Sequence, residues 1–319
     1  MIVFFVASGN KAVGKVSAFV QSQFDSLKQE GLEMILFPVV GHGWKGYARN
    51  LFSLRRLIKK EKPDVVHAHY SSCGYLASLA SLGLKTKVVV SILGSFPRKN
   101  KKLRLVRFFV DHVWDATIVK SERTRSQLGR DLPVIPNGVD IDRFTIIEQD
   151  KAREIVGFEK DRKYVIFVAD PERPEKQFSL ARNAVERLND ESVQLIPVYN
   201  KPHKEVVIYL CAADALIMTS SNEGSPNVIK EAMACNCPIV VTDVGDVRWV
   251  TDCVDGTFVS NSFNSKEIAG LLRKALDFNK RTLGRVRIIH LGLTSHSIAQ
   301  RIIHVYSRMI DEVCLSVKN

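Results

Sequence analysis

The stretch of residues 214–238, DALIMTSSNEGSPNVIKEAMACNCP, reads as a strand, a loop and a helix in direct succession. Its first seven residues are mostly apolar, a polar loop containing Gly224 follows, and a helix is expected at 226–235. Ser225 is the expected N-cap and Pro226 the first helical residue, so free amides and the positive end of the helix dipole gather there. The stretch therefore predicts an anion-binding loop at the carboxyl end of a buried strand.

Two glutamates stand on either side of this expected anion site. Glu223 comes just before the helix, and Glu231 lies about a turn and a half inside it. Acids are common near a helix start because the dipole favours them, so both can be ordinary surface carboxylates. The alternative is a nucleotide site, in which Gly224 lets a ligand approach the backbone and the first-turn amides donate to it. The stretch alone leaves both interpretations open.

The pattern of an apolar strand followed by an amphipathic helix repeats along the chain. In the first half, β-branched and apolar runs predict strands at 2–7, 33–39, 64–69, 87–93, 116–120 and 134–136. In the second half they predict strands at 164–169, 193–198, 215–219, 239–242 and 257–259, with helices near 176–189, 204–212 and 226–235. Strands that alternate with helices indicate parallel sheets, so we expect an α/β protein with two doubly wound, Rossmann-like lobes.

The length agrees with two lobes. A chain of 319 residues with 45% hydrophobic content suits two domains of about 150 residues each. We expect a first lobe at 1–145, a second at 146–295 and a final helix within 296–319, with the charged segment 144–162 as a linker and a first amphipathic turn. Because open parallel sheets bind ligands at the carboxyl ends of their strands, the cleft between the lobes is the expected ligand site.

No segment is typical of a membrane span or of a zinc site. No apolar run approaches the roughly 18 residues that a span needs, and 1–7 is interpreted as a first buried strand rather than a signal peptide. The six cysteines lack the C-x-x-C spacing of zinc and redox sites, so we interpret them as reduced thiols in the core. We therefore expect a soluble, cytoplasmic protein.

The positive charge is concentrated in the first lobe. The net charge of the chain is +12, and between Lys45 and Arg130 nineteen cations against five acids give +14. Such a segment suggests an anionic partner, namely nucleic acid, an acidic membrane surface or a phosphorylated substrate. A lysine-rich, solvated surface without a partner is the alternative.

Four motifs that follow one another along the chain resemble the signature of one enzyme family. The run at 223–246, EGSPNVIKEAMACNCPIVVTDVGD, is similar to that of the family 4 glycosyltransferases, with Glu223 and Glu231 at their E-x7-E spacing. Residues 64–69 (DVVHAH), 135–144 (IPNGVDIDRF) and 167–176 (FVADPERPEK) resemble a strand, an interlobe segment and a phosphate-binding loop of this family. The resemblance implies a bacterial surface-polysaccharide enzyme of the GT-B fold. Its first lobe (1–145) would bind the acceptor, its second lobe (146–295) would bind the nucleotide sugar, and its C-terminal helix would cross back to the first lobe.

The resemblance also implies roles for particular residues. Glu231 would accept from both ribose hydroxyls of a UDP- or GDP-linked sugar, and Glu223 would orient that sugar. Lys176, with Arg173 in place of the family's loop arginine, would neutralise the departing diphosphate. The residues expected to line the sugar and diphosphate are Gly224, Ser225, Pro226, Asn227 and Val228. Family members retain the anomeric configuration, and the departing phosphate itself can take the acceptor's proton, so neither a protein nucleophile nor a metal cofactor is expected.

At two positions the sequence departs from the family pattern, and these departures change which residues we expect to carry the family's roles. Leu93 stands where many members have a histidine, so we assign the acceptor-side catalytic role to His69, with His67 as a weaker candidate. The alternative is that His69 has no catalytic role and that backbone groups at the strand end hydrogen-bond its ring. In the phosphate-binding loop this chain lacks the arginine that the family has, and we expect Arg173 to replace it. The alternative interpretation is that Arg173 only forms an ion pair with a nearby acid.

Two possible metal sites are set aside. Asp140 and Asp142 match the D-x-D pattern by which another glycosyltransferase fold binds manganese, but we interpret them as part of a turn. His67 and His69 share one face of a strand without a third ligand, so no metal is expected there.

The expected partners follow from the family and from the charge. They are a nucleotide-sugar donor and a glycan or lipid-diphosphate-linked acceptor. The basic amphipathic segment 98–109 suits an anionic membrane surface, so we expect a peripheral location on the inner face of the cytoplasmic membrane. Nucleic acid is not expected, because the basic segment has no interleaved aromatics or reader motif. The alternatives are a GT-B sugar-nucleotide epimerase and, from another class, a nucleic-acid-binding α/β protein.

Overall fold

The protein divides into two compact units. The fold is given by a computed structural model, which describes residues 1–9, 14–41, 43–94 and 101–316. Unit 1 comprises Met1–Asn137 with Ser295–Asn319, and unit 2 comprises Gly138–Thr294. The first boundary falls before the expected position at 145/146, because residues 138–144 pack into unit 2. There Val139 bridges to Thr294, and the carbonyl of buried Phe144 accepts a hydrogen bond from Arg285 at 2.8 Å.

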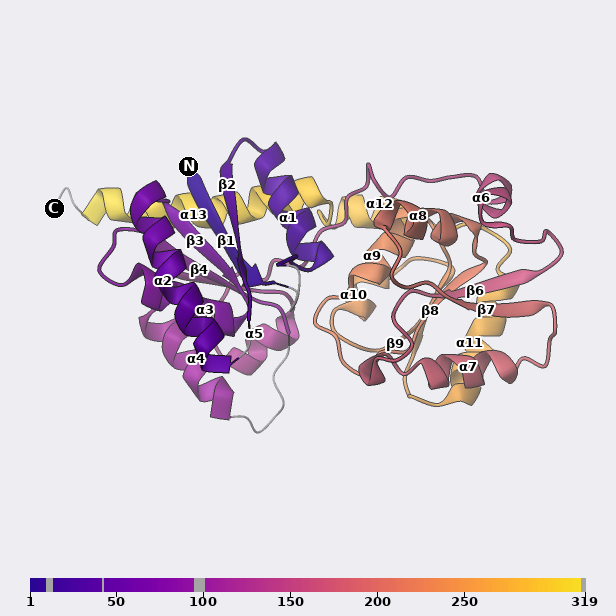
Figure 1. The fold of residues 1–319 in the computed structure, drawn as a ribbon. Helices are drawn as coiled ribbons and strands as arrows, with labels where there is room; N and C mark the ends of the chain where they lie inside the picture. Colours follow the sequence, from indigo (N-terminus) through magenta and orange to yellow (C-terminus); the bar gives the residue numbers. More distant parts are fainter. Residues whose placement is uncertain (10–13, 42, 95–100, 317–319) are drawn as a thin grey trace. The chain divides into compact units, whose positions relative to one another are not determined.

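Unit 1 contains a five-stranded parallel sheet between helices (Figure 1). Its strands are β1 (Ile2–Ser8), β2 (Glu33–Val39), β3 (Val65–His69), β4 (Lys87–Ile92) and β5 (Ala116–Val119), in the order β2-β1-β3-β4-β5. Its helices are α1 (Ala18–Gln29), α2 (Gly43–Glu61), α3 (Ser71–Ser81), α4 (Lys101–His112), α5 (Glu122–Leu128) and α13 (Ser295–Ser316). The predicted strand at 134–136 is wrong, since Val134 makes one isolated bridge to Val119. Prolines at 133 and 136 lack the amides that a ladder needs.

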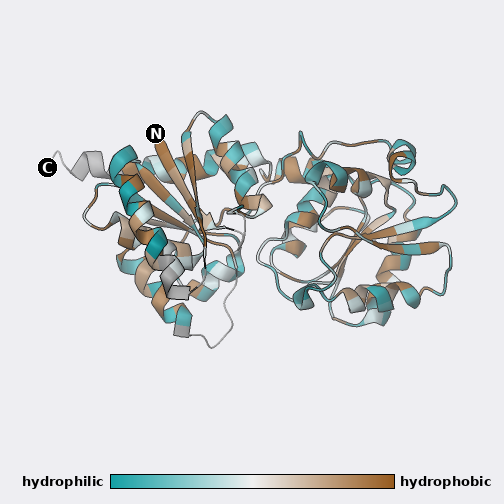
Figure 2. Ribbon diagram, in the orientation of Figure 1, coloured by the Kyte–Doolittle hydropathy of each residue, from teal (hydrophilic) through white to brown (hydrophobic). Residues whose placement is uncertain are grey.

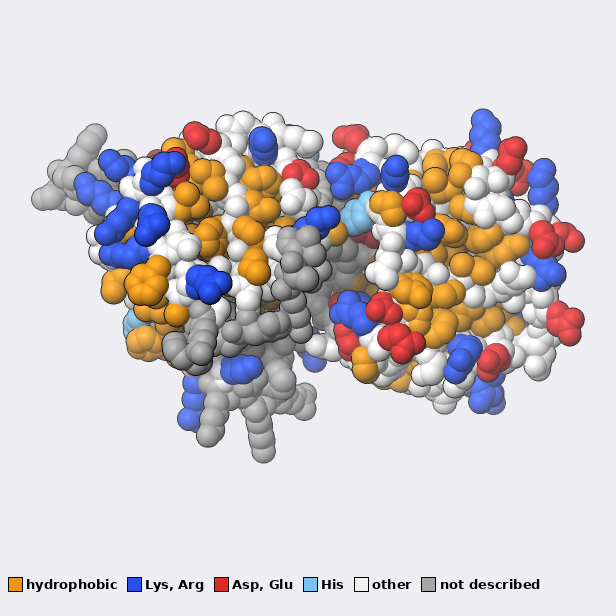
Figure 3. Space-filling model, viewed as in Figure 1, with side chains coloured by type: hydrophobic (Ala, Val, Ile, Leu, Met, Phe, Trp, Pro, Cys, Tyr) orange, Lys and Arg blue, Asp and Glu red, His pale blue; other side chains and the backbone are white. Residues whose placement is uncertain are grey.

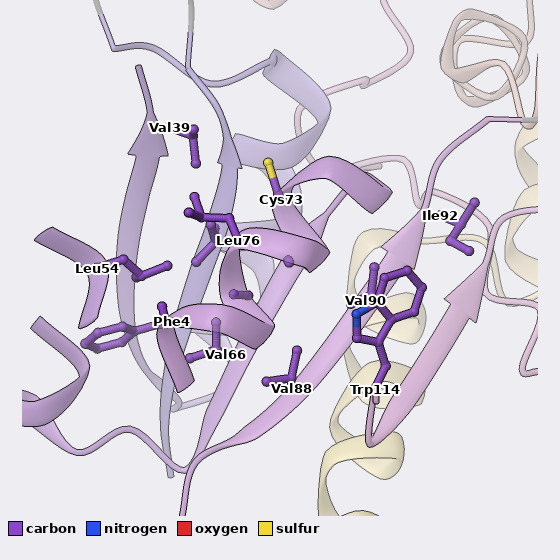
Figure 4. Packing of buried hydrophobic residues seen from close by; sticks show 14 of the residues in the cluster. Phe4, Val39, Leu54, Val66, Cys73, Leu76, Val88, Val90, Ile92 and Trp114 are labelled. Atoms are coloured by element: carbon purple, nitrogen blue, oxygen red, sulfur yellow. The ribbon is translucent and has the colours of Figure 1, made fainter. Parts of the chain in front are cut away.

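The two faces of this sheet meet different helices. Leu54 of α2 and Leu76 of α3 pack over Phe4 (Figure 4). Farther along the sheet, Trp114 lies against Val90. The opposite face is covered by α1 and by the C-terminal helix α13, which pack against each other. The prediction that the final helix returns to the first lobe is therefore confirmed.

Unit 2 repeats this topology with a second parallel sheet. Its strands are β6 (Lys163–Phe167), β7 (Val193–Pro197), β8 (Ala215–Met218), β9 (Ile239–Thr242) and β10 (Thr257–Ser260), in the order β10-β9-β8-β6-β7. Its helices are α6 (Gln149–Val156), η1 (Pro174–Lys176, a 3-10 turn), α7 (Phe178–Glu186), α8 (His203–Ala212), α9 (Asn227–Ala234), α10 (Val247–Thr251), α11 (Ser265–Asp277) and α12 (Gly284–His290). The strands of both sheets are hydrophobic along most of their length (Figure 2), as expected for sheets covered on both faces. The prediction of two doubly wound lobes is confirmed.

The charged segment at 144–162 contains the predicted amphipathic turn as a helix, and it packs into unit 2 instead of serving only as a linker. It forms α6, which packs on α8 and ends at Gly157 in the left-handed conformation. The buried Arg153 donates to the carbonyl of Ala212 at 3.1 Å and to the carboxylate of Asp214 at 2.7 Å. A charged segment can be buried when its arginine finds such acceptors, and composition does not reveal them.

Two further findings concern the membrane and the thiols. Within the described ranges, no helix is long and apolar enough to span a membrane. Cys73, Cys211, Cys235 and Cys237 are free and buried, as expected. The same interpretation is wrong for Cys253, which is exposed in the turn after α10 with a φ of +59°.

Candidate active site

The loops that carry the predicted donor-site residues meet at the topological switch point of unit 2. Strand β6 is flanked by β8 on one side and β7 on the other, and such sheets bind ligands where the carboxyl ends of the two diverging strands open a crevice. Hydrogen bonds from Thr219 and Ser221 join the loops after β6 and β8. The Ser221 amide donates to the Glu175 carbonyl at 2.9 Å, and Thr219 Oγ1 donates to the Lys176 carbonyl at 2.9 Å. The fold thus brings residues 167–176 and the start of 223–246 together.

Lys176 and Glu223 form an ion pair in this place. Lys176 Nζ lies 2.5 Å from Glu223 Oε1, and the side chains retain only 17% and 21% of their exposure. Partial shielding from water makes such a pair stronger than a fully exposed one. Gln177, at a φ of +50°, separates η1 from α7, so the helix predicted near 176–189 is confirmed but runs only from Phe178 to Glu186. A glycine would adopt this left-handed conformation without strain, whereas Gln177 adopts it at some cost.

Helix α9 begins without a side-chain cap. The prediction that Ser225 is its N-cap is wrong, since the N-cap position belongs to Pro226, which offers no hydroxyl. The Ser225 hydroxyl instead donates to Asp246 Oδ2 at 2.5 Å and accepts from the Lys230 ammonium. Pro226 therefore offers the first-turn amides no capping oxygen, and the helix dipole favours an anion in front of them.

A buried ion pair anchors this loop. Lys230 is 1% exposed, and its Nζ lies 3.7 Å from Oδ2 of Asp246, whose side chain is 8% exposed. Burial lowers the pKa of Lys230, whereas the carboxylates of Asp246 and Glu231 oppose that lowering. Removal of Asp246 would leave the ammonium buried without its nearest counter-ion, which is costly in proteins. The pair thus fixes the position of Ser225 at the start of α9.

Gly245 supports the Glu223 loop by close backbone contact. Its φ is +62°, and a Cβ atom there would lie 2.5 Å from the Gly224 carbonyl oxygen and 3.1 Å from that of Glu223. Both the conformation and the contact exclude a side chain.

Replacing Gly245 by alanine should lower the free energy of unfolding by about 3 kcal/mol, because left-handed strain and overpacking add. Urea unfolding of the full chain measures the change. The matched control is Gly270→Ala in α11, where nothing lies within 4 Å of the added methyl group. That change should stabilise the protein by about 0.5 to 1 kcal/mol, as expected in a helix. Equal effects of the two substitutions would contradict the tight contact at Gly245.

Glu231 presents a poorly solvated carboxylate on α9. The side chain keeps part of its surface open, and among the described residues none is hydrogen-bonded to the carboxylate. Burial raises its pKa to about 7, and the neighbouring Lys230 ammonium opposes the rise. Such an acceptor gains most from a ligand that donates hydroxyl groups to it, as a vicinal diol does.

Arg173 lies at the edge of the same loop and is paired with a neighbour. Its Nε donates to Glu175 Oε1 at 2.8 Å, and the two side chains are 56% and 43% exposed. The structure therefore shows the ion pair with a nearby acid that was the alternative interpretation of Arg173. An exposed pair contributes little to stability, so it does not bar exchange for another anion. The role of Arg173 at a diphosphate stays a prediction.

His69 belongs to unit 1 and does not fit its predicted role. Its ring is completely buried, stacked on His67 with centroids 4.6 Å apart and lying 4.5 Å from the ring of Phe5. Burial holds its pKa well below the usual value. Within the described part of the chain neither ring nitrogen has a hydrogen-bond partner, so the backbone-bonded alternative is wrong. A ring without exposed surface cannot touch an acceptor, and the acceptor-side catalytic assignment of His69 is corrected.

The two motifs set aside as metal sites have structural roles. His67 uses both ring nitrogens, bonding the Tyr306 hydroxyl at 2.5 Å and the Ser91 hydroxyl at 2.8 Å. Asp140 Oδ1 accepts from the amide of Arg143 at 3.0 Å, which confirms the turn interpretation. The described segments contain no group of three His, Cys, Asp or Glu side chains that could hold a metal ion.

Four residues that build the site have no role predicted from the sequence, namely Thr219, Lys230, Gly245 and Asp246. Lys230 carried a detectable signal, since it shares the buried side of α9 with Ile229 and Met233. A lysine on an apolar helical stripe needs a buried partner. The partner could not be identified in advance, because it comes from the loop after β9.

Two family models match the two units in turn. The model Glycosyltransferase Family 4 matches residues 15–143, and the model Glycosyl transferases group 1 matches residues 154–277. Together with the two switch-point sheets and the E-x7-E helix, these matches define the class. The chain belongs to the family 4 glycosyltransferases.

Curated relatives and solved structures agree with this class. TuaC of Bacillus subtilis (strain 168), named for teichuronic acid biosynthesis, is 28% identical over 214 residues, covering 58% of this chain and 54% of that protein. The chain thus spans about half the length of TuaC. An Escherichia coli UDP-Gal:alpha-D-GlcNAc-diphosphoundecaprenol alpha-1,3-galactosyltransferase is 25% identical over 272 residues, covering 70% of each protein. The structure of Anabaena HepE in complex with UDP, 16% identical, has a TM-score of 0.75 over 97% of this chain and 100% of that one, which shows the shared GT-B fold.

Proposed function

We propose that the protein is a retaining glycosyltransferase that moves a sugar from a UDP- or GDP-linked donor to a lipid-linked glycan acceptor in polysaccharide or glycoconjugate synthesis. The observation that carries the proposal is the Lys176–Glu223 pair at the switch point of unit 2, beside the uncapped start of α9 and Glu231. The E-x7-E spacing and the matched family models support the same assignment. The names of the two curated relatives support a lipid-linked surface glycan.

Different residues of the site bind different parts of the donor. The first-turn amides of α9 and the Lys176 ammonium bind the diphosphate, whose negative charge grows as the sugar departs. Glu231 accepts from the ribose hydroxyls, and Glu223 orients the donor sugar after it exchanges its pairing with Lys176 for sugar hydroxyls. The departing phosphate takes the acceptor's proton, so the reaction needs no carboxylate nucleophile. Because Lys176 and the amides supply positive charge, we propose that transfer needs no metal ion.

A nucleotide screen tests this function. Thermal unfolding of the full chain with UDP, GDP and ADP, with and without a chelator, should show one nucleotide that stabilises without metal. At 100 times its dissociation constant a ligand adds about 2.7 kcal/mol. The corresponding sugar nucleotide should then lose its sugar to acceptor. Conversion of the sugar nucleotide without acceptor would favour the epimerase alternative, and stabilisation by duplex DNA but by no nucleotide would refute the proposal.

We also propose that unit 1 rests on the cytoplasmic membrane surface through α4. Leu105 and Phe108 are 48% and 54% exposed, and the exposed cations Lys102 and Arg104 stand beside them. Lysine and arginine side chains also gather over α2 on one face of the same unit (Figure 3). Apolar side chains among cations suit the interface of an anionic bilayer. The protein would then be a peripheral protein of the inner face.

Part of the predicted membrane segment serves the fold instead. Val106 is completely buried, Phe109 packs against Trp114, and Arg107 donates to the Gln127 carbonyl at 2.8 Å. These three residues are therefore corrected to structural roles. Residues 98–100 lie outside the described part of the chain.

Co-sedimentation with vesicles tests the membrane surface. The wild-type chain should bind phosphatidylglycerol vesicles better than phosphatidylcholine vesicles, with less binding as salt rises. Replacing Leu105 and Phe108 together by serine should reduce binding at least about ten-fold, since both apolar side chains lose their burial in lipid. Phe263→Ser is the matched control, because Phe263 is equally exposed (51%) but lies in unit 2. Equal binding to both lipids would count against the surface.

A further inference from the structure

Unit 1 has a topological switch point of its own, and a cavity opens there. Strand β1 lies between β2 and β3, so the carboxyl ends of β1 and β3 form the crevice where an open parallel sheet binds ligands. A cavity of about 730 Å³ lies at these ends. Its lining comes from the end of β1 and the loop after it, from the β3–α3 connection and from the start of α4: Ser8, Gly9, Lys15, Val16, Ser17, Tyr70, Ser71, Ser72 and Lys102.

The lining has the chemistry of an anion site. The described residues of the lining include the two cations Lys15 and Lys102 and no carboxylate. Three other cavities of similar size in the described chain are each lined by at least one Asp or Glu. No described carboxylate lies within 4.0 Å of the Lys15 ammonium, as the ion pairs of the structure show. Serine hydroxyls at 17, 71 and 72 add donors, and α3 starts behind Tyr70 without a side-chain cap.

We infer that this cavity binds a phosphoryl group of the acceptor. The inference rests on the proposed function for the identity of the ligand as an acceptor, but the anion site itself rests on the cavity and its lysines. Lys15 and Lys102 donate to the phosphate oxygens, and the hydroxyls and first-turn amides of α3 complete the shell. The two units then have parallel tasks, since each binds phosphate at the switch point of its sheet.

The surface next to the cavity indicates the source of this phosphate. Lys102, Leu105 and Phe108 follow one another at three-residue intervals along α4, which places them on one side of the helix within about 9 Å. The exposed apolar side chains thus begin where the cationic cavity ends. A prenyl diphosphate fits both parts, with its phosphates at the lysines and its first prenyl units on Leu105 and Phe108.

Binding of two simple probes to the full chain tests the inference. Inorganic diphosphate and geranyl diphosphate are titrated by calorimetry, in saturating nucleotide and again in the Lys176→Ala variant, so that the site in unit 2 does not contribute. Lys15→Ala and Lys102→Ala should each weaken diphosphate binding about ten-fold, the usual effect of losing one charged hydrogen bond. Lys28→Ala, an exposed lysine of α1 outside the cavity, should bind as the wild type does. Thermal unfolding confirms that each variant is folded.

The results distinguish a lipid-linked acceptor from a free phosphorylated one. They also distinguish failure of the anion site from failure of the proposed transferase function. Tighter binding of geranyl diphosphate than of diphosphate, lost in Phe108→Ser, assigns a lipid-linked acceptor. Equal binding of both probes assigns a free phosphorylated acceptor to the same site. Lack of diphosphate binding, or binding that is indifferent to both lysines, overturns the inference. If no nucleotide binds but diphosphate still depends on Lys15, the anion site stands and the proposed transferase function fails.

Discussion

Replacing Glu231 by alanine should weaken donor-nucleotide binding about 100-fold. The carboxylate is poorly solvated and has no hydrogen-bond partner among the described residues, so two ribose hydroxyls would give it charge-assisted bonds that it otherwise lacks. Two such bonds contribute roughly 3 kcal/mol or more, which is a factor of about 100 in the dissociation constant. Calorimetric titration with the nucleotide selected by the screen measures it. Glu154→Ala on α6, an exposed acid of the same unit, is the matched control.

The affinity should also depend on pH through Glu231. Its pKa in the free protein is about 7, and only the ionised carboxylate accepts both hydroxyls. The competent fraction falls about ten-fold from pH 8 to pH 6, so the apparent dissociation constant should rise about ten-fold over this range. Glu231→Gln should remove this dependence. A wild-type affinity that is flat between pH 6 and 8 would contradict the assignment.

The same pKa has a consequence for the stability of the free protein. In the folded state Glu231 holds a proton that the unfolded chain releases at about 4.5, its ordinary pKa. The folded state therefore binds more protons between these two values, and the stability contributed by this group is lost as the pH rises from about 4.5 to about 7. Bound nucleotide should largely remove this trend, because it favours the ionised form.

The strands were predictable because a parallel strand is a local pattern. Runs such as Val3 to Ala7 or Ile239 to Thr242 consist of apolar or β-branched residues along their whole length, as burial on both faces requires. The failures came where a partner distant in sequence decided the outcome. Ser225 has the type and position of an N-cap, but Lys230 and Asp246 take its hydroxyl. Nothing local to Ser225 distinguishes these two fates.

The candidate site was predictable in unit 2 and not in unit 1 for a related reason. The E-x7-E spacing places Glu223 in the loop directly before α9 and Glu231 on that helix, so one local segment of sequence carries both carboxylates. His69 stands at the end of a strand, where a side chain can face solvent or a covering helix. Its burial depends on the far end of the chain, since α13 covers that face of the sheet and bonds His67 through Tyr306.

Removing the Lys176 ammonium should slow transfer far more than it weakens binding. Lys176→Ala should lower kcat by about 10² to 10³, because the diphosphate gains negative charge as the sugar leaves and a preorganised cation counts most at that moment. In the free protein this ammonium is already held 2.5 Å from Glu223, in a position fixed by the Thr219 contact to its backbone. Steady-state transfer with saturating donor separates kcat from KM. Lys274→Ala, an exposed lysine on α11, is the control and should leave both unchanged.

Combining the substitution with one at Glu223 identifies what the pair does. Glu223→Ala should also lower turnover, since the donor sugar loses an acceptor that orients it. If the two side chains act on one ligand, the double variant should lose less than the product of the single losses, because residues that work as a unit are not additive. An increase of KM with an unchanged kcat in Lys176→Ala would instead mean that the ammonium binds the donor equally in the ground and transition states. The leaving-group role assigned to Lys176 would then be wrong, although the donor site itself would stand.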